Sequence, residues 1–588
     1  MMPKNIILCA DGTGNKGGYT PDSNVYKVYK AVEKNLSEED RNRFGVTEQI
    51  IFYDNGVGTN KNKYLRALSG GLGFGFGQNV KDLYKFLARN YEHGDRVYLF
   101  GFSRGASTIR AFNGFVYACG LLKGKNISNK DLDDKVEEAF DAYRWEGIRN
   151  KRWHRLIKFL TGQHLPKSPA DLKEADGSHG AIDIHFTGIW DTVVALGFPK
   201  RTDVVSPVSL VLRLGFMIFE KVANFISPHS FYNYRLTRNQ IHAYQALALD
   251  DERTAFWPFV WNENIPEDGG SSGKGERTVE QVWFAGMHSN VGGGYNRSGL
   301  ASVPLYWMMG KAQVHGLCFE GDAVQQARND AHVHGRMYNS RDGAAILYRY
   351  HPREIESLCR VKSDRSRFRK VLDVLLGERK TGRLRFRDGR IRIYDSVINR
   401  MEHRTANYAP CLIPDHFKIV QDEIHEDLSV RTRAVDVKPA SDSEWEQNKS
   451  RIRRYIFIRK LLYDIMVLMI CYTLWRAFGY WVSPPEYLER SGLAGHLADV
   501  LDYILPDFFG GLIEVAVAQN PFIFLAAVAI VWMYILIRRK VHRKMSALCQ
   551  LKRRKVIHAD REKLDDTVEP FEFSPVLTRD AAMSEADV

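Results

Sequence analysis

A serine inside a G-x-S-x-G pattern is the residue of this chain best placed to act as a nucleophile. The segment 96–106, RVYLFGFSRGA, is a β-type run followed by that pattern and then by a helical stretch. A sharp strand-to-helix turn lifts the serine oxygen above a sheet, and the flanking glycines avoid clashes in the bend. We therefore predict that Ser103 is a nucleophile; the alternative is a capping serine in a glycine-rich turn.

A serine nucleophile in an α/β-hydrolase needs an acid and then a histidine later in the chain. Asp191 follows directly after the β-branched and aromatic run 182–190, and His288 ends another strand inside the glycine-rich segment 283–295. Both are candidates for orienting acid and general base. Spacing leaves rivals open, namely Asp183, Asp203, Asp250 and Asp251 for the acid and His185, His229, His242 and His315 for the base.

Two backbone amides are candidates for binding a developing oxyanion. The amide of Arg104 follows the serine at a helix N-terminus, and a second amide near Gly12 belongs to the loop CADGTGN at 9–15. The same loop resembles the D-x-D-G-T pattern of phosphatases that form a phospho-aspartate. Cys9 stands where that nucleophilic carboxylate would be, which disfavours phosphatase chemistry.

The elements that would position these residues alternate between short apolar runs and helical stretches. That alternation predicts an α/β fold with a mostly parallel sheet, whose strand carboxyl ends carry the functional residues. The expected strands are 5–10, 48–53, 96–101, 182–190 and 279–286, and the expected helices are 24–33, 78–91, 104–118, 239–249 and 300–314.

Composition places the chain among ordinary globular proteins. Its 588 residues are 44% hydrophobic and 26% charged, which argues against whole-chain disorder and against a polytopic transporter. The seven cysteines are far apart and never form a C-x-x-C pair, so we expect a reducing compartment without a disulfide framework or zinc site. No metal or cofactor is predicted.

The net charge of +13 comes from two blocks near the C-terminus. Residues 449–460 carry six Lys or Arg and residues 538–555 carry nine, with no acid in either block. Because the remainder is not basic, we do not expect nucleic-acid binding. The blocks enclose two apolar stretches, 461–482, which Asp464 and Arg476 interrupt, and 515–537.

This arrangement predicts an α-helical membrane hairpin with both chain ends cytoplasmic. The alternative is a buried or interfacial helix pair. The N-terminal apolar run is too short for a secretory signal peptide, so we expect a membrane-associated protein whose catalytic domain faces the cytoplasm.

Two further segments bear on substrate binding. The apolar segment 203–227 could form a lid over the site, or else a buried core helix. Residues 383–394, with Asp388-Gly389 as the turn, predict a β-hairpin that gathers like charges on one face. That face could contact lipid headgroups, or pair with acids elsewhere; its arginines are Arg385, Arg387, Arg390 and Arg392.

Four segments together resemble the α/β-hydrolase family that includes the phospholipase effectors of type VI secretion. They are NIILCADGTGN, GFSRGA, GIWDTV and WFAGMHSNVGGGY, and a weaker likeness extends to 348–353 and 407–410. The resemblance implies an esterase or phospholipase with Ser103 as nucleophile, Asp191 as orienting acid and His288 as general base. Ala285-Gly-Met287 and Asn290 differ from the Pro-Gly and Asp often found in that histidine loop.

These observations predict a serine hydrolase, of phospholipase A type, acting on a lipid ester at a membrane. A membrane-anchored scaffold with an inactive hydrolase fold is the alternative. We expect a catalytic domain over 1–320, an accessory region over 321–448, a helical hairpin over 449–555 and a polar tail over 556–588.

Overall fold

A computed structural model provides the structure of the chain. It describes residues 2–564 except 13–14, 16, 20, 56–74, 150–166, 194–230, 265–276, 362–382, 425–429, 438–442, 483–494, 497, 501–502 and 504–520. The predicted lid at 203–227 lies outside the described residues, as does the chain from 565 onward.

A nine-stranded sheet forms the centre of the protein, in the order β2-β1-β3-β4-β5-β6-β7-β8-β9. All neighbouring strands are parallel except β8 and β9, which confirms the predicted α/β class with a mostly parallel sheet. The strands are β1 (Asn5–Ala10), β2 (Gln49–Asp54), β3 (Arg96–Phe102), β4 (Ile184–Trp190), β5 (Gln240–Ala248), β6 (Thr278–Phe284), β7 (Ile391–Tyr394), β8 (Phe417–Ile424) and β9 (Val430–Val437).

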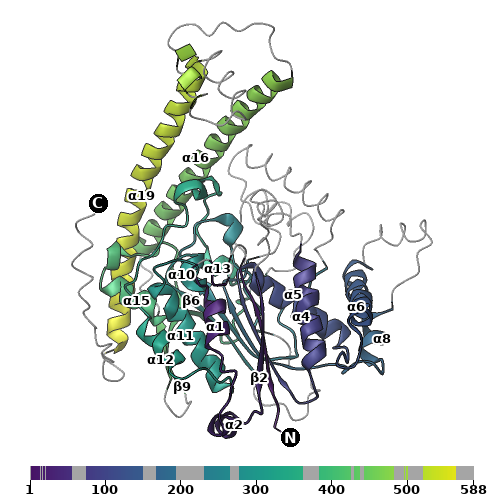
Figure 1. Ribbon diagram of the computed structural model, residues 1–588. Helices are drawn as coiled ribbons and strands as arrows, with labels where there is room; N and C mark the ends of the chain where they lie inside the picture. The colour runs from purple at the N-terminus through teal and green to yellow at the C-terminus, as the bar shows by residue number, and fades with distance from the viewer. Residues whose placement is uncertain are drawn as a thin grey trace.

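Helices cover both faces of this sheet (Figure 1). One face carries α4 (Phe76–Asn90), α5 (Arg104–Cys119) and α6 (Asn129–Arg149), and the other carries α1 (Asn24–Ala31), α11 (Gly299–Val314) and α12 (Ala323–Asn329). Shorter helices are α2 (Glu38–Phe44), α8 (Pro169–Glu174), α10 (His288–Gly292), α13 (Ile355–Leu358) and α15 (Asp395–Glu402). Two separate apolar clusters, one on each face, hold these layers together.

The prediction of a helix at 239–249 was wrong, because this segment is the strand β5. It pairs in parallel with β4 on one side and β6 on the other, and six consecutive residues at its end are buried. A strand buried on both faces has no alternation of apolar and polar residues, so its sequence resembles a buried helix. Tertiary packing therefore overrides the helix propensity of its alanines.

The predicted β-hairpin at 383–394 was also wrong. Only 391–394 form a strand, and this strand, β7, pairs in parallel with β6 and β8 instead of with 384–387. The arginines have partners within the protein: Arg392 contacts Glu263 at 3.0 Å, Arg390 contacts Asp436 at 3.2 Å, and Arg385 donates to main-chain carbonyls. These contacts favour the alternative in which the charges pair within the chain. Strands β7 to β9 also extend the sheet into the region expected to be accessory.

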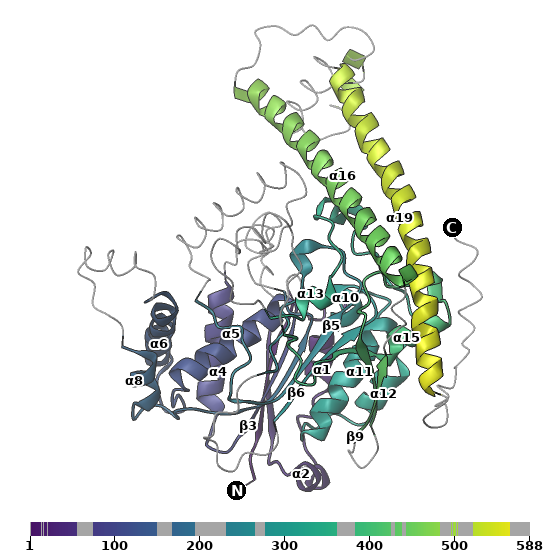
Figure 2. The same cartoon turned by 180° about the vertical axis from the view of Figure 1, so that it is seen from behind.

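The C-terminal region forms a pair of long helices that lie side by side, α16 (Ser443–Val482) and α19 (Pro521–Leu564). Figure 2 shows the two helices leading away from the sheet. The helical part of the hairpin prediction is therefore confirmed, and α19 also includes 556–564, which we had assigned to the polar tail. Among the described residues, however, no helix has the length and apolarity that a membrane crossing requires.

The first half of α16 contacts the sheet domain through charged side chains, which explains part of the basic composition of the C-terminal region. Arg459 of α16 forms an ion pair with Glu252 at 3.2 Å, and Lys449 pairs with Asp415. Asp464, which interrupts the first apolar stretch, is buried 3.9 Å from Arg349. Arg459 and Lys449, which were expected to flank a membrane, thus form contacts within the protein.

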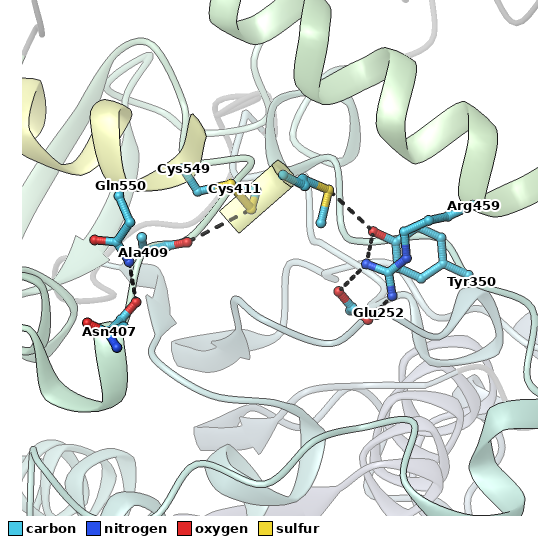
Figure 3. Close-up of a disulfide and its surroundings, with 9 residues drawn as sticks. Glu252, Tyr350, Asn407, Ala409, Cys411, Arg459, Cys549 and Gln550 are labelled. Carbon is cyan, nitrogen blue, oxygen red and sulfur yellow. Dashed lines mark hydrogen bonds and ion pairs between the residues drawn. A yellow bond between two sulfur atoms is a disulfide. The ribbon is translucent and has the colours of Figure 1, made fainter. Parts of the chain in front are cut away.

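A disulfide joins Cys411 in the loop before β8 to Cys549 of α19 (Figure 3). The two cysteines are 138 residues apart, so their spacing carried no signal, and the expectation of a chain without a disulfide was wrong. Arg459 and Tyr350 form a second attachment nearby, with a hydrogen bond of 2.8 Å. The base of the helix pair is therefore held at two places.

Candidate active site

Ser103 lies at a tight turn between β3 and α5, as its sequence pattern predicts. Its backbone has φ 57° and ψ −119°, a conformation that side chains rarely adopt. Gly105 makes the turn sterically possible, because a Cβ there would lie 2.1 Å from the Ala10 carbonyl oxygen. The helix α5 can thus begin directly against β1 and present Ser103 at the carboxyl end of the sheet.

His288 contacts both of the other predicted residues. Its Nε2 lies 2.7 Å from the Ser103 hydroxyl oxygen, and its Nδ1 lies 2.5 Å from Asp191 Oδ2. Ser103, Asp191 and His288 are 8%, 0% and 4% exposed, respectively. They follow β3, β4 and β6, so the chain order is Ser, Asp, His. The sheet thus brings together three residues that are at least 88 positions apart in sequence.

Asp191 is held by more than the histidine. Its Oδ1 accepts from the Ala248 amide at 2.9 Å and from Arg353 Nη1 at 2.7 Å, while Oδ2 accepts from Arg353 Nη2 at 2.7 Å. Burial alone would raise the pKa of this carboxyl group. The adjacent Arg353 and His288 outweigh burial and hold the pKa of Asp191 well below its usual range. The carboxylate is therefore ionised.

The loop that carries His288 is fixed by a second carboxylate. Asp251 Oδ2 accepts from the His288 amide at 3.3 Å, and Asp251 is itself paired with Arg253 at 2.6 Å. Phe256 and Phe102 lie against the imidazole ring, with centroid distances of 5.0 and 4.7 Å. Burial lowers the pKa of His288, because the charged imidazolium loses its hydration. The imidazole is therefore neutral at pH 7 and available to accept a proton.

The first loop lies next to the serine, but the Gly12 amide has another partner. A Cβ on Gly12 would lie 3.2 Å from the Ser103 Cβ, which places the loop as predicted. Its N–H donates to Asp11 Oδ1 at 2.6 Å, and Asp11 also accepts from Ser23 and Tyr53. Because that N–H is already used, the Arg104 amide, at the first position of α5, remains as the candidate oxyanion donor.

The rival residues lie elsewhere or have other contacts. His185, His242 and His315 form a cluster of rings near the start of β4 and β5, at the opposite end of the strands from Ser103. Asp250 accepts from the Gly286 amide and the Tyr408 hydroxyl. Asp183 lies just before β4, and Asp251 holds the His288 amide as described above. Asp203 and His229 fall outside the described residues.

The sequence did not predict the roles of three residues near the site. Asp251 was considered only as a rival acid, and Arg253 and Arg353 were not considered. Arg353 lies 162 positions from its partner Asp191, in a loop between the last turn near Tyr348 and α13. Residues 348–353 had been noted only as part of the family resemblance. A buried arginine has no distinguishing sequence pattern, so only the fold reveals its partner.

The sequence of the chain is similar to known proteins. The family model described as "T6SS, Phospholipase effector Tle1-like, catalytic domain" matches residues 4–311. The uncharacterized protein YEL023C of Saccharomyces cerevisiae is 29% identical over 226 residues, 35% of this chain and 30% of that protein. This chain therefore spans about a third of the length of that curated relative.

A solved structure is more distantly similar. The crystal structure of an uncharacterized protein from Pseudomonas aeruginosa has a TM-score of 0.30 and 16% identity, and the likeness covers 58% of this chain and 50% of that one.

Proposed function

Because the chain belongs to the family of Tle1-like phospholipase effectors of type VI secretion, through its catalytic domain, we propose that it is a serine hydrolase of phospholipid esters. We propose a phospholipase A-type reaction, in which a carboxylic ester bond is cleaved through an acyl-enzyme. Family membership supports a lipid hydrolase, and the reaction type is our inference from the site.

The observation that carries the proposal is the position of His288 between Ser103 and Asp191. A hydroxyl, an imidazole and a carboxylate in consecutive hydrogen-bond contact can move one proton away from the hydroxyl while holding the imidazole in a single tautomer. The strained backbone at Ser103 supports the same role, because strain of this kind accumulates at functional sites.

The proposed reaction has two steps. In the first, His288 Nε2 takes the proton of Ser103 as the serine oxygen bonds to the ester carbonyl carbon, and the Arg104 amide stabilises the negative oxygen. The ester C–O bond then breaks, and the leaving alcohol receives the proton from His288. In the second step, water gives a proton to His288 as its oxygen bonds to the acyl carbon. His288 then returns this proton to the serine oxygen as the acyl–serine bond breaks, which releases a fatty acid and free serine.

We also propose that the far end of the helix pair contacts a lipid surface. Trp475 of α16 and Trp532 of α19 are 67% and 64% exposed. Further exposed apolar side chains on the two helices are Ile465, Leu468, Tyr472, Met533 and Leu536. Tryptophan and tyrosine favour the boundary between lipid and water, where one part of the ring is wet.

Vesicle co-sedimentation tests this contact. We expect the double variant Trp475→Glu, Trp532→Glu to lose most of its binding to anionic phospholipid vesicles while still hydrolysing a short-chain water-soluble ester. Unchanged vesicle binding would contradict the proposed contact. Tyr117→Glu, which alters an exposed aromatic residue on α5, is the matched control.

Lipid mass spectrometry tests the proposed activity. The native chain and its Ser103→Ala variant are incubated with mixed phospholipids and neutral glycerides, and fatty acids and lysolipids are measured. We expect lysolipid release that depends on Ser103. Release from neutral glycerides alone would keep the serine hydrolase and change its substrate class. No serine-dependent release together with no labelling by a fluorophosphonate would favour the inactive scaffold.

A further inference from the structure

We infer that Arg353 is a positioning residue of the active site, which acts through Asp191 to fix both the orientation and the charge of the group behind His288. The inference rests on the proposed function, because it assigns Arg353 a role in the reaction of Ser103. It also adds to the site a residue that lies after the segment 4–311 matched by the family model.

The guanidinium of Arg353 uses all four of its terminal N–H bonds at this place. Nη1 donates to Asp191 Oδ1 and to the Ala248 carbonyl, and Nη2 donates to Asp191 Oδ2 and to the Phe256 carbonyl. The paired contact with Asp191 fixes the plane of the carboxylate. Oδ2 is thereby held toward His288 Nδ1, which is the orientation that the imidazole needs in order to accept a proton at Nε2.

The loop that carries Arg353 is itself firmly attached to the rest of the site. The His351 amide donates to the Glu252 carbonyl at 2.7 Å, and Trp257 Nε1 donates to the His351 carbonyl at 2.9 Å. Tyr350 forms an isolated β-bridge with Arg253. The side chain of Arg353 is 0% exposed, so its contact with Asp191 is not weakened by competition from water.

Arg353 also changes the charge balance of the site. The groups that face His288 or its partners are Asp191, Asp251, Arg253 and Arg353, and Asp250 lies near Arg353 as well. Asp251 and Arg253 are paired with each other. Arg353 therefore supplies the positive charge that offsets Asp191. Because of this charge, the Asp191 carboxylate remains ionised although it has no contact with water. The offset carboxylate also attracts the imidazolium of His288 less strongly than an uncompensated one would.

Removing the positive charge should therefore move the acid limb of the reaction upward. In Arg353→Met, either Asp191 retains a proton to higher pH or the uncompensated carboxylate raises the pKa of His288. With either change, the active form of the site, in which a neutral His288 lies beside an ionised Asp191, appears only at higher pH. In the native chain, the limb should lie below the ordinary histidine value of 6.5, because burial lowers the pKa of His288.

The experiment measures the rate at which a fluorophosphonate probe labels Ser103 from pH 4.5 to 9.5. For Arg353→Met, we expect the acid limb to shift upward by about 1 to 3 pH units, with the labelling rate lowered most below the new limb. Arg353→Lys retains the charge but loses the paired contact, so its limb should stay near the native position while its rate falls at every pH.

Arg341→Met is the matched control. Arg341 is also fully buried, and its guanidinium donates to the carbonyls of Ile346 and Tyr348. This variant should lose thermal stability without any shift of the acid limb. Circular dichroism of all variants establishes which ones are folded, and if Arg353→Met does not fold, the lysine variant decides.

Each outcome bears on the inference. An acid limb of Arg353→Met that coincides with the native one, with the rate lowered equally at every pH, would show a merely structural role. A lysine variant equal to the native chain in rate at every pH would show that the paired contact is not needed. If the native chain is not labelled at all, the proposed function fails, and the inference falls with it because Arg353 then has no reaction to serve.

Discussion

Replacing Ser103 by alanine, His288 by alanine, or both together is expected to lower kcat by the same factor, about 10⁶. The reason is that the hydroxyl and the imidazole act as one unit, since the imidazole has no function in the reaction without the proton of the serine. The 2.7 Å contact between His288 Nε2 and the serine oxygen is the basis of this coupling. Once either partner is absent, only binding and the oxyanion amide remain.

Steady-state hydrolysis of a water-soluble ester by the two single variants and the double variant measures this effect. Losses that multiply in the double variant would contradict the shared role. Ser107→Ala is the matched control, because Ser107 is a buried serine one turn along α5 whose hydroxyl donates to the Val193 carbonyl. Its effect should be on stability, with kcat close to that of the native chain.

Replacing Asp191 by asparagine is expected to lower kcat by about 10⁴, with a smaller change in KM. An amide in place of the carboxylate no longer stabilises the imidazolium and permits the wrong tautomer of His288. The surroundings add a second effect, because Arg353 would remain buried beside a neutral group. An uncompensated buried charge of this kind costs about 3 to 5 kcal/mol of stability.

Kinetics and chemical denaturation of Asp191→Asn measure both effects. Asp250→Asn is the informative comparison. Burial already raises the pKa of Asp250 to about 6, so a neutral side chain at this position costs the protein little. Its loss of kcat and of stability should both be far smaller. Equal effects of the two substitutions would show that Asp191 has no special relation to His288.

The sequence was sufficient for the parts of the site that have local patterns. The run of five apolar residues 6–10 marked β1, and G-x-S-x-G between a strand and a helix marked the turn at Ser103. Asp191 and His288 were found because each follows a β-type run and because the four segments resemble a known family. Positions at strand ends converge in a parallel sheet, so identifying the strands was almost enough to assemble the three residues.

Features that depend on distant partners were not predictable in this way. Strand β5 lacks alternation because both of its faces are buried. The arginines at 385–392 suggested a false hairpin because their partners lie outside that segment, and Glu263, the partner of Arg392, is 129 residues away. The contact of Arg353 with Asp191 and the disulfide between Cys411 and Cys549 could not be predicted either, because in both cases the partners are far apart in sequence. The apolar helices at the C-terminus were located, but their hydropathy could not show that their bases pack on the sheet domain.

The backbone at Ser103 also has a consequence for stability. Its positive φ would suit glycine better than any residue with a side chain, since the strain of such a conformation costs about 1 to 3 kcal/mol elsewhere. A scaffold with no reaction to perform would gain stability from glycine at this position, because glycine has no Cβ. Serine therefore occupies this position at a cost in stability, which fits the reactive role that we propose for its hydroxyl.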